Sequence, residues 1–200
     1  MRVISGRFKG VALTTPKSGT RPTTDRTKEA IFSHLDSWGV LDDARVLDLF
    51  AGTGALGIEA LSRGARGLVA VESSAPAAAL IAQTLTALKH NRSWEHGMSA
   101  RVVKARAEKY AASASAVEPF DMVFIDPPYA FETNDCNQLL ADLASRELTS
   151  SNTVIMLERS TRSEAPTAPA NWEITDRRDY GETAVYYIEP SEPISDNDQQ

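Results

Sequence analysis

Apolar and polar residues recur along this chain with two different periods. Short apolar runs are typical of buried β-strands, whereas apolar positions three or four residues apart are typical of helices that bury one face. The runs that predict strands are 45–49, 68–72, 100–104, 121–125, 153–158, 172–178 and 183–189. Helices are expected at about 25–38, before the first strand, and then after successive strands. The later helices run from the glycine-rich turn to 61, over 76–89, over a short segment that begins at 107, and over 134–146.

The order of these segments predicts an α/β fold. Strands and helices alternate up to the fifth strand, which indicates a mostly parallel seven-stranded sheet with helices on both faces. The last two strands have no helix between them, so we expect an antiparallel C-terminal edge hairpin. Two β-prone runs, 2–5 and 11–14, flank Gly6 and Gly10 and predict a small N-terminal β-hairpin extension.

Length and composition indicate one main domain. The chain has 200 residues, of which 42% are hydrophobic, enough to bury one core. We expect an N-terminal hairpin at 1–20, a large domain at 21–189 and a disordered acidic tail at 190–200. Cys136 is the single cysteine, the first ten residues lack the apolar run of a signal peptide, and no apolar stretch approaches the length that spans a bilayer. A cytoplasmic protein without membrane insertion follows, and we expect a monomer.

The charge is unevenly distributed. The net charge is −6, yet residues 1–28 carry seven bases and one acid, Asp25, for a segment charge of +6. Such asymmetry fits a basic arm that contacts phosphate, and it fits a solvated terminus equally well. The seven bases are Arg2, Arg7, Lys9, Lys17, Arg21, Arg26 and Lys28.

A glycine-rich turn follows the first long strand. Gly52 and Gly54 in DLFAGTGALG let the backbone approach a ligand at the carboxyl end of the strand. This spacing, with Glu72 twenty residues after Gly52, fits a nicotinamide dinucleotide as well as S-adenosylmethionine. Asp48 favours the latter, because a carboxylate before the turn suits an ammonium and a sulfonium and repels a pyrophosphate.

A second motif follows the fourth strand. In Asp126-Pro127-Pro128-Tyr129 the prolines remove two N–H donors, which leaves the Asp126 carboxylate and the Pro127 carbonyl as acceptors. Such acceptors match the exocyclic amine of a nucleobase, and Tyr129 supplies a stacking face for an extruded base. A rigid Pro-Pro turn with an Asp cap is the plainer interpretation, but the position at a strand end favours chemistry.

Several segments together resemble a known family. RVISGRFKG, RPTTDRTKEAIF, LDLFAGTGALGIEALSRGA, VFIDPPY and PANW are similar to the RsmD family of bacterial ribosomal RNA guanine-N2 methyltransferases. The resemblance covers most of residues 1–189 and is weakest at 92–100 and 159–170. It implies a class I S-adenosylmethionine-dependent, Rossmann-like fold and methylation of one guanine in small-subunit (16S) ribosomal RNA, presented on an assembled or assembling 30S subunit.

The resemblance also implies roles for individual residues. The residues expected to hold the target guanine and to carry catalysis are Asp126, Pro127, Pro128 and Tyr129. Those expected at S-adenosylmethionine are Asp48, Phe50, Ala51, Gly52, Thr53, Gly54, Glu72, Ser73, Arg106 and Ala107. Those expected at RNA are Arg2, Arg7, Lys9, Arg21, Pro22, Thr23 and Arg26. No metal is expected, because methyl transfer from a sulfonium needs neither a Lewis acid nor an activated water.

Three alternatives remain open. A DNA adenine-N6 or cytosine-N4 methyltransferase shares the DPPY motif, but it usually needs a target-recognition region for which this chain has no spare segment. A nicotinamide-dependent oxidoreductase would explain the glycine-rich turn and leave DPPY unexplained. A catalytically inert RNA-binding protein would not require Asp126 and Tyr129.

Overall fold

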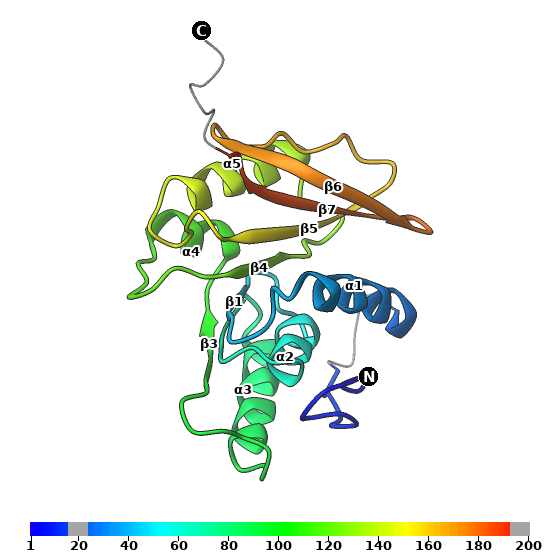
Figure 1. The fold of residues 1–200 in the computed structure, drawn as a ribbon, viewed down its shortest axis with the longest axis vertical. Coiled ribbons are helices and arrows are strands. Elements are labelled where there is room, and N and C mark those ends of the chain that lie inside the picture. Colours follow the sequence, from blue (N-terminus) through cyan, green and yellow to red (C-terminus); the bar gives the residue numbers. More distant parts are fainter. Residues whose placement is uncertain (16–23, 193–200) are drawn as a thin grey trace, which may run out of the picture.

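The computed structural model describes residues 1–15 and 24–192, and its core is one seven-stranded sheet (Figure 1). The strands alternate with helices up to the fifth strand, as the apolar periodicity predicted. The strands are β1 (Arg45–Asp48), β2 (Gly67–Glu72), β3 (Ser99–Lys104), β4 (Met122–Ile125), β5 (Val154–Ser160), β6 (Trp172–Tyr180) and β7 (Thr183–Pro190). The helices are α1 (Asp25–Trp38), α2 (Ala55–Ser62), α3 (Ala75–Lys89), α4 (Ala107–Ser113) and α5 (Thr133–Ala144).

Local signals explain where two of the helices begin and end. The Thr24 side chain accepts a hydrogen bond from the Thr27 backbone N–H, which caps α1. Gly39 ends α1 in the left-handed conformation, with φ 68°. Ser74 caps α3 in the same way as Thr24, by accepting from the Ala77 N–H.

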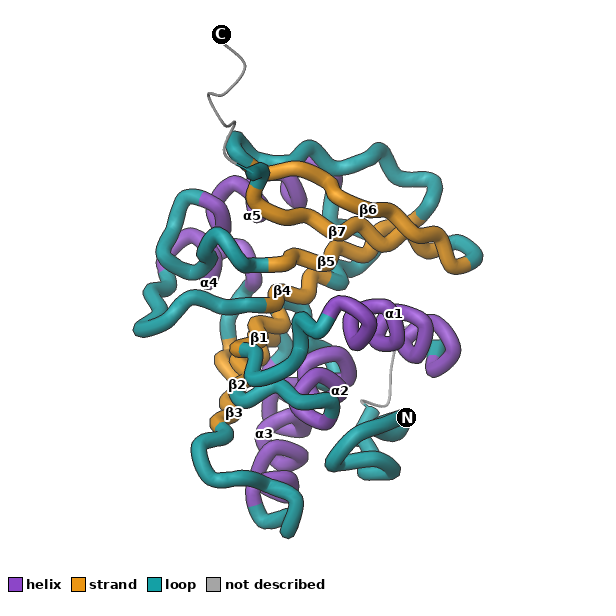
Figure 2. The backbone as a smooth tube through the Cα atoms, viewed as in Figure 1, coloured by secondary structure: helices purple, strands orange, loops and turns teal. Residues whose placement is uncertain are grey.

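The sheet reverses its strand order at β1. The order across the sheet is β3-β2-β1-β4-β5-β7-β6, so the chain builds outward from β1 first on one side and then on the other (Figure 2). The five strands from β3 to β5 are parallel, and β7 lies antiparallel between β5 and β6. The expected fold class and the antiparallel C-terminal hairpin are both confirmed. Ligands of open α/β sheets bind where the strand order reverses, so the gap between the ends of β1 and β4 is the place to look for a site.

Two apolar clusters hold the helices to the two faces of the sheet. One contains residues of α1, α2 and α3, and the other contains residues of α4 and α5. Ile31 and Leu35 of α1, four residues apart, are both fully buried, as expected for one face of a helix. Cys136 is likewise a buried residue of α5. Within residues 1–15 and 24–192, no helix combines the length and the apolar character needed to cross a bilayer.

The N-terminal segment packs closely against the helices. Residues 2–5 and 11–14 do meet in antiparallel fashion, but only through the isolated bridge of Arg2 with Ala12, so the predicted hairpin has no regular strands. Val3, Phe8 and Leu13 are at most 4% exposed and belong to the apolar cluster of α1 and α2. These three side chains therefore anchor residues 1–13 to the core, although the charge of the segment fitted a basic arm.

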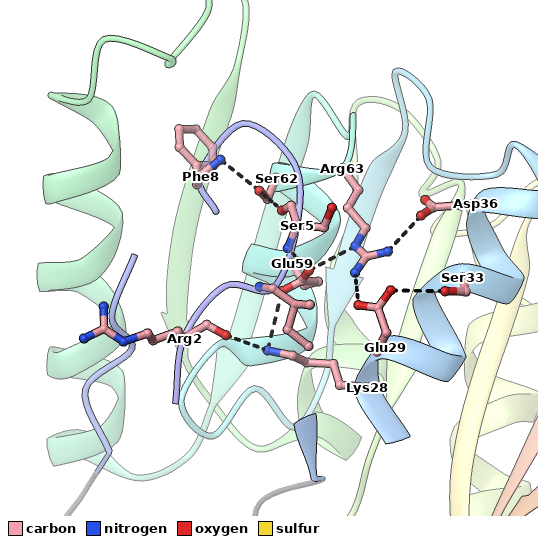
Figure 3. A network of polar contacts seen from close by, with 11 residues as sticks. Arg2, Ser5, Phe8, Lys28, Glu29, Ser33, Asp36, Glu59, Ser62 and Arg63 are labelled. Atoms are coloured by element: carbon pink, nitrogen blue, oxygen red, sulfur yellow. Dashed lines mark hydrogen bonds and ion pairs between the residues drawn. The ribbon is translucent and has the colours of Figure 1, made fainter. Parts of the chain in front are cut away.

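Backbone groups of this segment are also held by α2. The buried Glu59 carboxylate accepts hydrogen bonds from the Ile4 and Ser5 N–H groups, at 2.9 and 3.1 Å (Figure 3). Gly6 lies so close to α2 that an added Cβ would be 1.9 Å from the Ser62 carbonyl oxygen. The close approach explains why this turn, with φ 85°, requires glycine.

The predicted acidic tail lies mostly outside the described residues. β7 continues to Pro190, and the Ser191 N–H donates to the Asn171 carbonyl, so the ordered sheet extends slightly past the predicted boundary. Residues 193–200 are not described.

Candidate functional site

Three acidic residues converge at the carboxyl edge of the sheet. Asp48 ends β1, Glu72 ends β2, and Asp126 directly follows β4. These strands are parallel neighbours, so their ends face the same way on both sides of the strand-order reversal. The structure therefore brings together the acids of the two predicted motifs.

The glycine-rich turn makes a close, left-handed path from β1 into α2. Gly52 and Gly54 have φ values of 57° and 80°, a region that favours glycine. Space around Gly52 is open: nothing lies within 4 Å of the position a Cβ would take. The Ala51 N–H donates to the Val71 carbonyl at 3.0 Å, which fixes the turn to the end of β2. The exposed backbone at Gly52 is thus open to a ligand.

The Asp48 carboxylate is buried beneath this turn. The residue is 1% exposed, and its Oδ2 accepts a hydrogen bond from the Gly57 N–H at 3.1 Å. Its Oδ1 is buried without a hydrogen-bond partner among the described residues. Burial raises the Asp48 pKa to about 7; the Gly57 hydrogen bond opposes the rise, and the nearby charges of Asp126 and Glu72 add to it. A buried acceptor of this kind is stabilised when a cation or an N–H donor binds to it.

Glu72 ties the turn to the start of α3. Its Oε2 accepts from the Gly52 N–H and its Oε1 accepts from the Ser74 N–H, both at 2.8 Å. Each carboxylate oxygen has a second lone pair, so these bonds orient the side chain and leave acceptor capacity for hydroxyl groups. Ser73, which lies between Glu72 and Ser74 in the sequence, is exposed.

The loop after β4 presents an open aromatic face. Asp126 and Pro127 are half-buried, whereas Pro128 is exposed and Tyr129 is 82% exposed. The Pro128 carbonyl accepts from the Phe131 N–H at 2.9 Å, which closes a turn. An exposed tyrosine beside a half-buried carboxylate is suited to hold a planar ligand that carries N–H donors.

One aromatic contact joins the two motifs. The ring of Phe50, in the glycine-rich turn, meets the ring of Phe131 edge-on, with 5.2 Å between centroids. Because Phe131 belongs to the turn that follows Tyr129, this contact holds the two loops side by side. Sequence reasoning assigned Phe50 to the cofactor region and gave Phe131 no role.

The remaining predicted cofactor residues follow β3 or lie in the turn. Arg106 precedes α4, and its guanidinium, 66% exposed, pairs with Glu108 at 2.7 Å. Ala107 is buried at the first position of α4. Ala51 and Thr53 lie in the turn, buried and half-buried respectively.

The predicted RNA-contacting residues fall into different environments. Lys9 and Arg26 are exposed. Arg2 is exposed and donates to the Gly10 carbonyl, while Arg7 is half-buried and pairs with Glu95 at 3.1 Å. Arg21, Pro22 and Thr23 lie outside the described residues. The free positive charge of the described N-terminal residues is therefore smaller than the sequence count implied.

Lys28, one of the seven bases counted in residues 1–28, is buried and is not part of a surface charge. It is 1% exposed, its Nζ lies 3.4 Å from the Glu59 Oε2, and it donates to the Arg2 carbonyl (Figure 3). The lysine cannot contact RNA, because it is buried where α1, α2 and the N-terminal segment meet and its ammonium group binds residues there. The same junction includes Arg63, whose three guanidinium nitrogens pair with Glu29, Asp36 and Glu59.

Sequence reasoning missed this junction. The signal available was Glu59 itself, an acid in the otherwise apolar segment ALGIEALS that forms α2. The junction anchors α2, and α2 begins at the turn that carries Gly54. It thereby supports the site without facing it.

The chain is similar to known proteins over nearly its whole length. The chain is 35% identical over 185 residues to "Ribosomal RNA small subunit methyltransferase D" of Escherichia coli strain K12, with 92% of this chain and 87% of that protein covered. It is 31% identical to the protein of the same name from Haemophilus influenzae, with 90% and 89% covered. Among solved structures, "Putative methyltransferase yhhF from Escherichia coli" superposes with a TM-score of 0.81 at 33% identity, with 96% of this chain and 98% of that chain covered.

The fold and the relatives together define a methyltransferase of the Rossmann-like class. The family model described as "Conserved hypothetical protein 95" matches residues 1–189. The chain belongs to this family, the RsmD family, as the resemblance of its motifs predicted.

Proposed function

We propose that this protein transfers a methyl group from S-adenosylmethionine to the exocyclic N2 amine of a guanine in small-subunit ribosomal RNA. The observation that carries the proposal is the meeting of two motifs at one edge of the sheet. The buried Asp48 and its glycine turn lie beside the Asp126-Pro127-Pro128-Tyr129 loop, and the contact of Phe50 with Phe131 holds the two together.

The residues at the end of β1 fit S-adenosylmethionine. The Asp48 Oδ1, which has no hydrogen-bond partner in the described part of the chain, is a buried acceptor that suits the ammonium of the amino acid moiety. Open space at Gly52 admits a ligand against the backbone, and the oriented Glu72 carboxylate can accept from ribose hydroxyls. A dinucleotide pyrophosphate would meet the acids Asp48, Glu72 and Asp126, which disfavours a nicotinamide-dependent oxidoreductase. When bound, the cofactor supplies an electrophilic methyl group on a sulfonium.

The loop after β4 suits an aromatic amine. The Asp126 carboxylate and the Pro127 carbonyl would accept the two amine hydrogens, which keeps the nitrogen lone pair from delocalising into the base and aims it at the methyl group. The exposed ring of Tyr129 would stack on the extruded base. The Asp126 carboxylate would keep its hydrogen bond to the amine while the nitrogen bonds to the methyl carbon and the bond from that carbon to sulfur breaks. The proton that the amine loses would pass through this carboxylate to solvent.

The choice of substrate comes from the relatives. Two curated relatives that span nearly the whole chain are named as small-subunit ribosomal RNA methyltransferases, and the family resemblance implies a guanine N2 target on an assembled or assembling 30S subunit. Exposed Lys9 and Arg26 supply positive charge for RNA phosphate on an otherwise acidic chain.

Nucleoside mapping tests the proposal. Small-subunit RNA would be digested and analysed by mass spectrometry from cells that carry the gene, lack it, or carry the Asp126→Ala variant. We expect one N2-methylguanosine that is present only with the wild-type gene. An unchanged set of methylated guanines in the deletion strain would refute the proposal.

A further inference from the structure

Positive charge gathers a second time along the chain, where β3 leads into α4. Residues 101–109 carry one acid, Glu108, against four bases, for a segment charge of +3 in a protein whose net charge is −6. The four bases are all exposed, and they are Arg101, Lys104, Arg106 and Lys109. Of these, only Arg106 has an expected role, beside the cofactor.

The four bases lie at one edge of the sheet. β3 is the outermost strand on its side, with β2 as its neighbour (Figure 1). Lys104 ends β3 in register with Glu72, so it lies at the carboxyl edge, next to the proposed cofactor site. Burial raises the pKa of Tyr110 in α4, and the charge and hydrogen bond of Arg101 oppose the rise, which places Arg101 against α4. We call this edge, with Arg101, Lys104, Arg106 and Lys109, the β3–α4 surface.

Two of these bases keep their charge free of acids. The ammonium groups of Lys104 and Lys109 make no ion pair within residues 1–15 and 24–192. The opposite edge of the sheet differs, because Arg177 and Arg178 of β6 pair with Asp179 and Asp176 at 2.9 and 3.1 Å. The β3–α4 surface therefore offers positive charge to a polyanion, whereas the bases of β6 are already neutralised.

Protection of the sheet edge does not account for this charge. Bases on an edge strand hinder the edge-to-edge pairing of two sheets, which is a sufficient reason for Arg101 and Lys104 in β3. Arg106 and Lys109, however, lie after the strand has ended. On β6 the same protection is given by charges of both signs. An excess of one sign that continues into α4 points to a ligand of the opposite charge.

The β3–α4 surface is within reach of an RNA whose base occupies the loop after β4. Strands β2 and β1 lie between β3 and β4, so three strand spacings, about 14 Å, separate them. About four nucleotides of a stacked strand cover this distance. An RNA with its target base at Tyr129 can therefore place neighbouring phosphates at Lys104 and Lys109.

We propose that the β3–α4 surface is a second RNA-binding surface, at which Lys104 and Lys109 contact phosphate groups close to the target base. Contacts of this kind position the RNA and add affinity, but they do not read its sequence. The inference rests on the proposed function, since it takes the ribosomal RNA as the ligand. It adds a docking surface on the side of the cofactor site away from the loop after β4.

The test compares two pairs of substitutions that remove the same charge. One protein carries Lys104→Ala and Lys109→Ala, and the control carries Lys89→Ala and Arg92→Ala, two exposed bases that precede β3. Affinity for small subunits from cells that lack the gene is measured by filter binding from about 50 to 200 mM salt. We expect the log–log salt slope to fall by about 1.4 to 1.8 for the first pair and to stay at the wild-type value for the control. The single-turnover rate of methyl transfer at saturating subunits should equal that of the wild type, because neither lysine contacts the base.

A cross-link identifies the partner at this surface. A photoreactive group attached to Lys109→Cys should cross-link to ribosomal RNA, and the same group on Lys89→Cys should not; the protein's own Cys136 is buried. Urea unfolding and calorimetric titration of the cofactor show that the variants are folded. An unchanged slope for the Lys104 and Lys109 pair, or cross-links to ribosomal protein alone, would overturn the inference and leave the proposed function intact. A wild-type protein that transfers no methyl group to the subunits would refute the proposed function, whichever slopes are measured.

Discussion

Replacing Asp48 by asparagine should stabilise the protein and weaken its hold on the cofactor. The carboxylate is fully buried, and only its Oδ2 has a hydrogen bond among the described residues, from the Gly57 N–H. Asparagine has the same shape and can keep this bond with its amide oxygen. It removes the charge whose desolvation raises the pKa of the acid to about 7.

The size of the effect follows from the pKa. Folding raises it from 3.8 to about 7, and each unit corresponds to about 1.4 kcal/mol. Because the folded pKa is higher than the unfolded one, the stability of the wild-type protein declines as the pH rises from about 4 through 7 and levels off above that. At pH 8 the burial of the ionised carboxylate lowers the stability of the folded protein by about 4 kcal/mol. At pH 5 the folded protein holds this carboxyl protonated, and the cost is about 2 kcal/mol.

Urea unfolding of both proteins at pH 5 and pH 8 measures this cost. All other titrating groups are shared, so the difference in unfolding free energy between Asp48→Asn and wild type isolates the carboxylate. We expect a stability advantage for the variant that is about 2 to 3 kcal/mol larger at pH 8 than at pH 5. An advantage that does not change with pH would show that the Asp48 pKa is not raised.

Further predictions follow from the same structure. The affinity of the wild-type protein for S-adenosylmethionine, followed by calorimetry, should fall about tenfold per pH unit below pH 7, because protonated Asp48 cannot face a cation; a flat profile from pH 5 to pH 8 would contradict this. Asp126→Ala should slow methyl transfer by on the order of 10²-fold and leave calorimetric cofactor affinity near the wild-type value, whereas equal loss of both would place Asp126 in cofactor binding. Gly6→Ala should cost at least about 3 kcal/mol more than Gly10→Ala in urea unfolding, since both have φ near 85° but only the Gly6 Cβ meets backbone; equal costs would mean that the contact with Ser62 is not tight. Lys9→Ala combined with Arg26→Ala should reduce the log–log salt slope of subunit binding by about 1.4 to 1.8, while the control pair Lys89→Ala and Arg92→Ala should not change it; an unchanged slope in the first pair would remove both residues from the RNA contact.

Periodic features of the sequence predicted the fold and much of the site. The apolar runs defined the seven strands, and the alternation of strands with helices defined the parallel part of the sheet. Because parallel strands end at one edge, Asp48 and Asp126, each expected near the end of a strand, had to lie at the same edge. The N-terminal segment was harder, because a charge count cannot tell an exposed base from a buried one.

Long-range pairs carry no periodic signal. Lys28 was counted among the surface bases, yet it is buried against Glu59. Nothing in the sequence around either residue indicates that the two pair.

The most direct test of the proposed function is methyl transfer in a defined mixture. Small subunits from cells that lack this gene would be incubated with the purified protein and methyl-labelled S-adenosylmethionine, with Asp126→Ala as the control. The RNA would then be digested and its labelled nucleosides separated. We predict that the label reaches one methyl group per subunit, recovered as N2-methylguanosine, and that the variant transfers on the order of 10²-fold more slowly. Label recovered in an adenine or cytosine amine, or no label in the RNA, would contradict the proposed function.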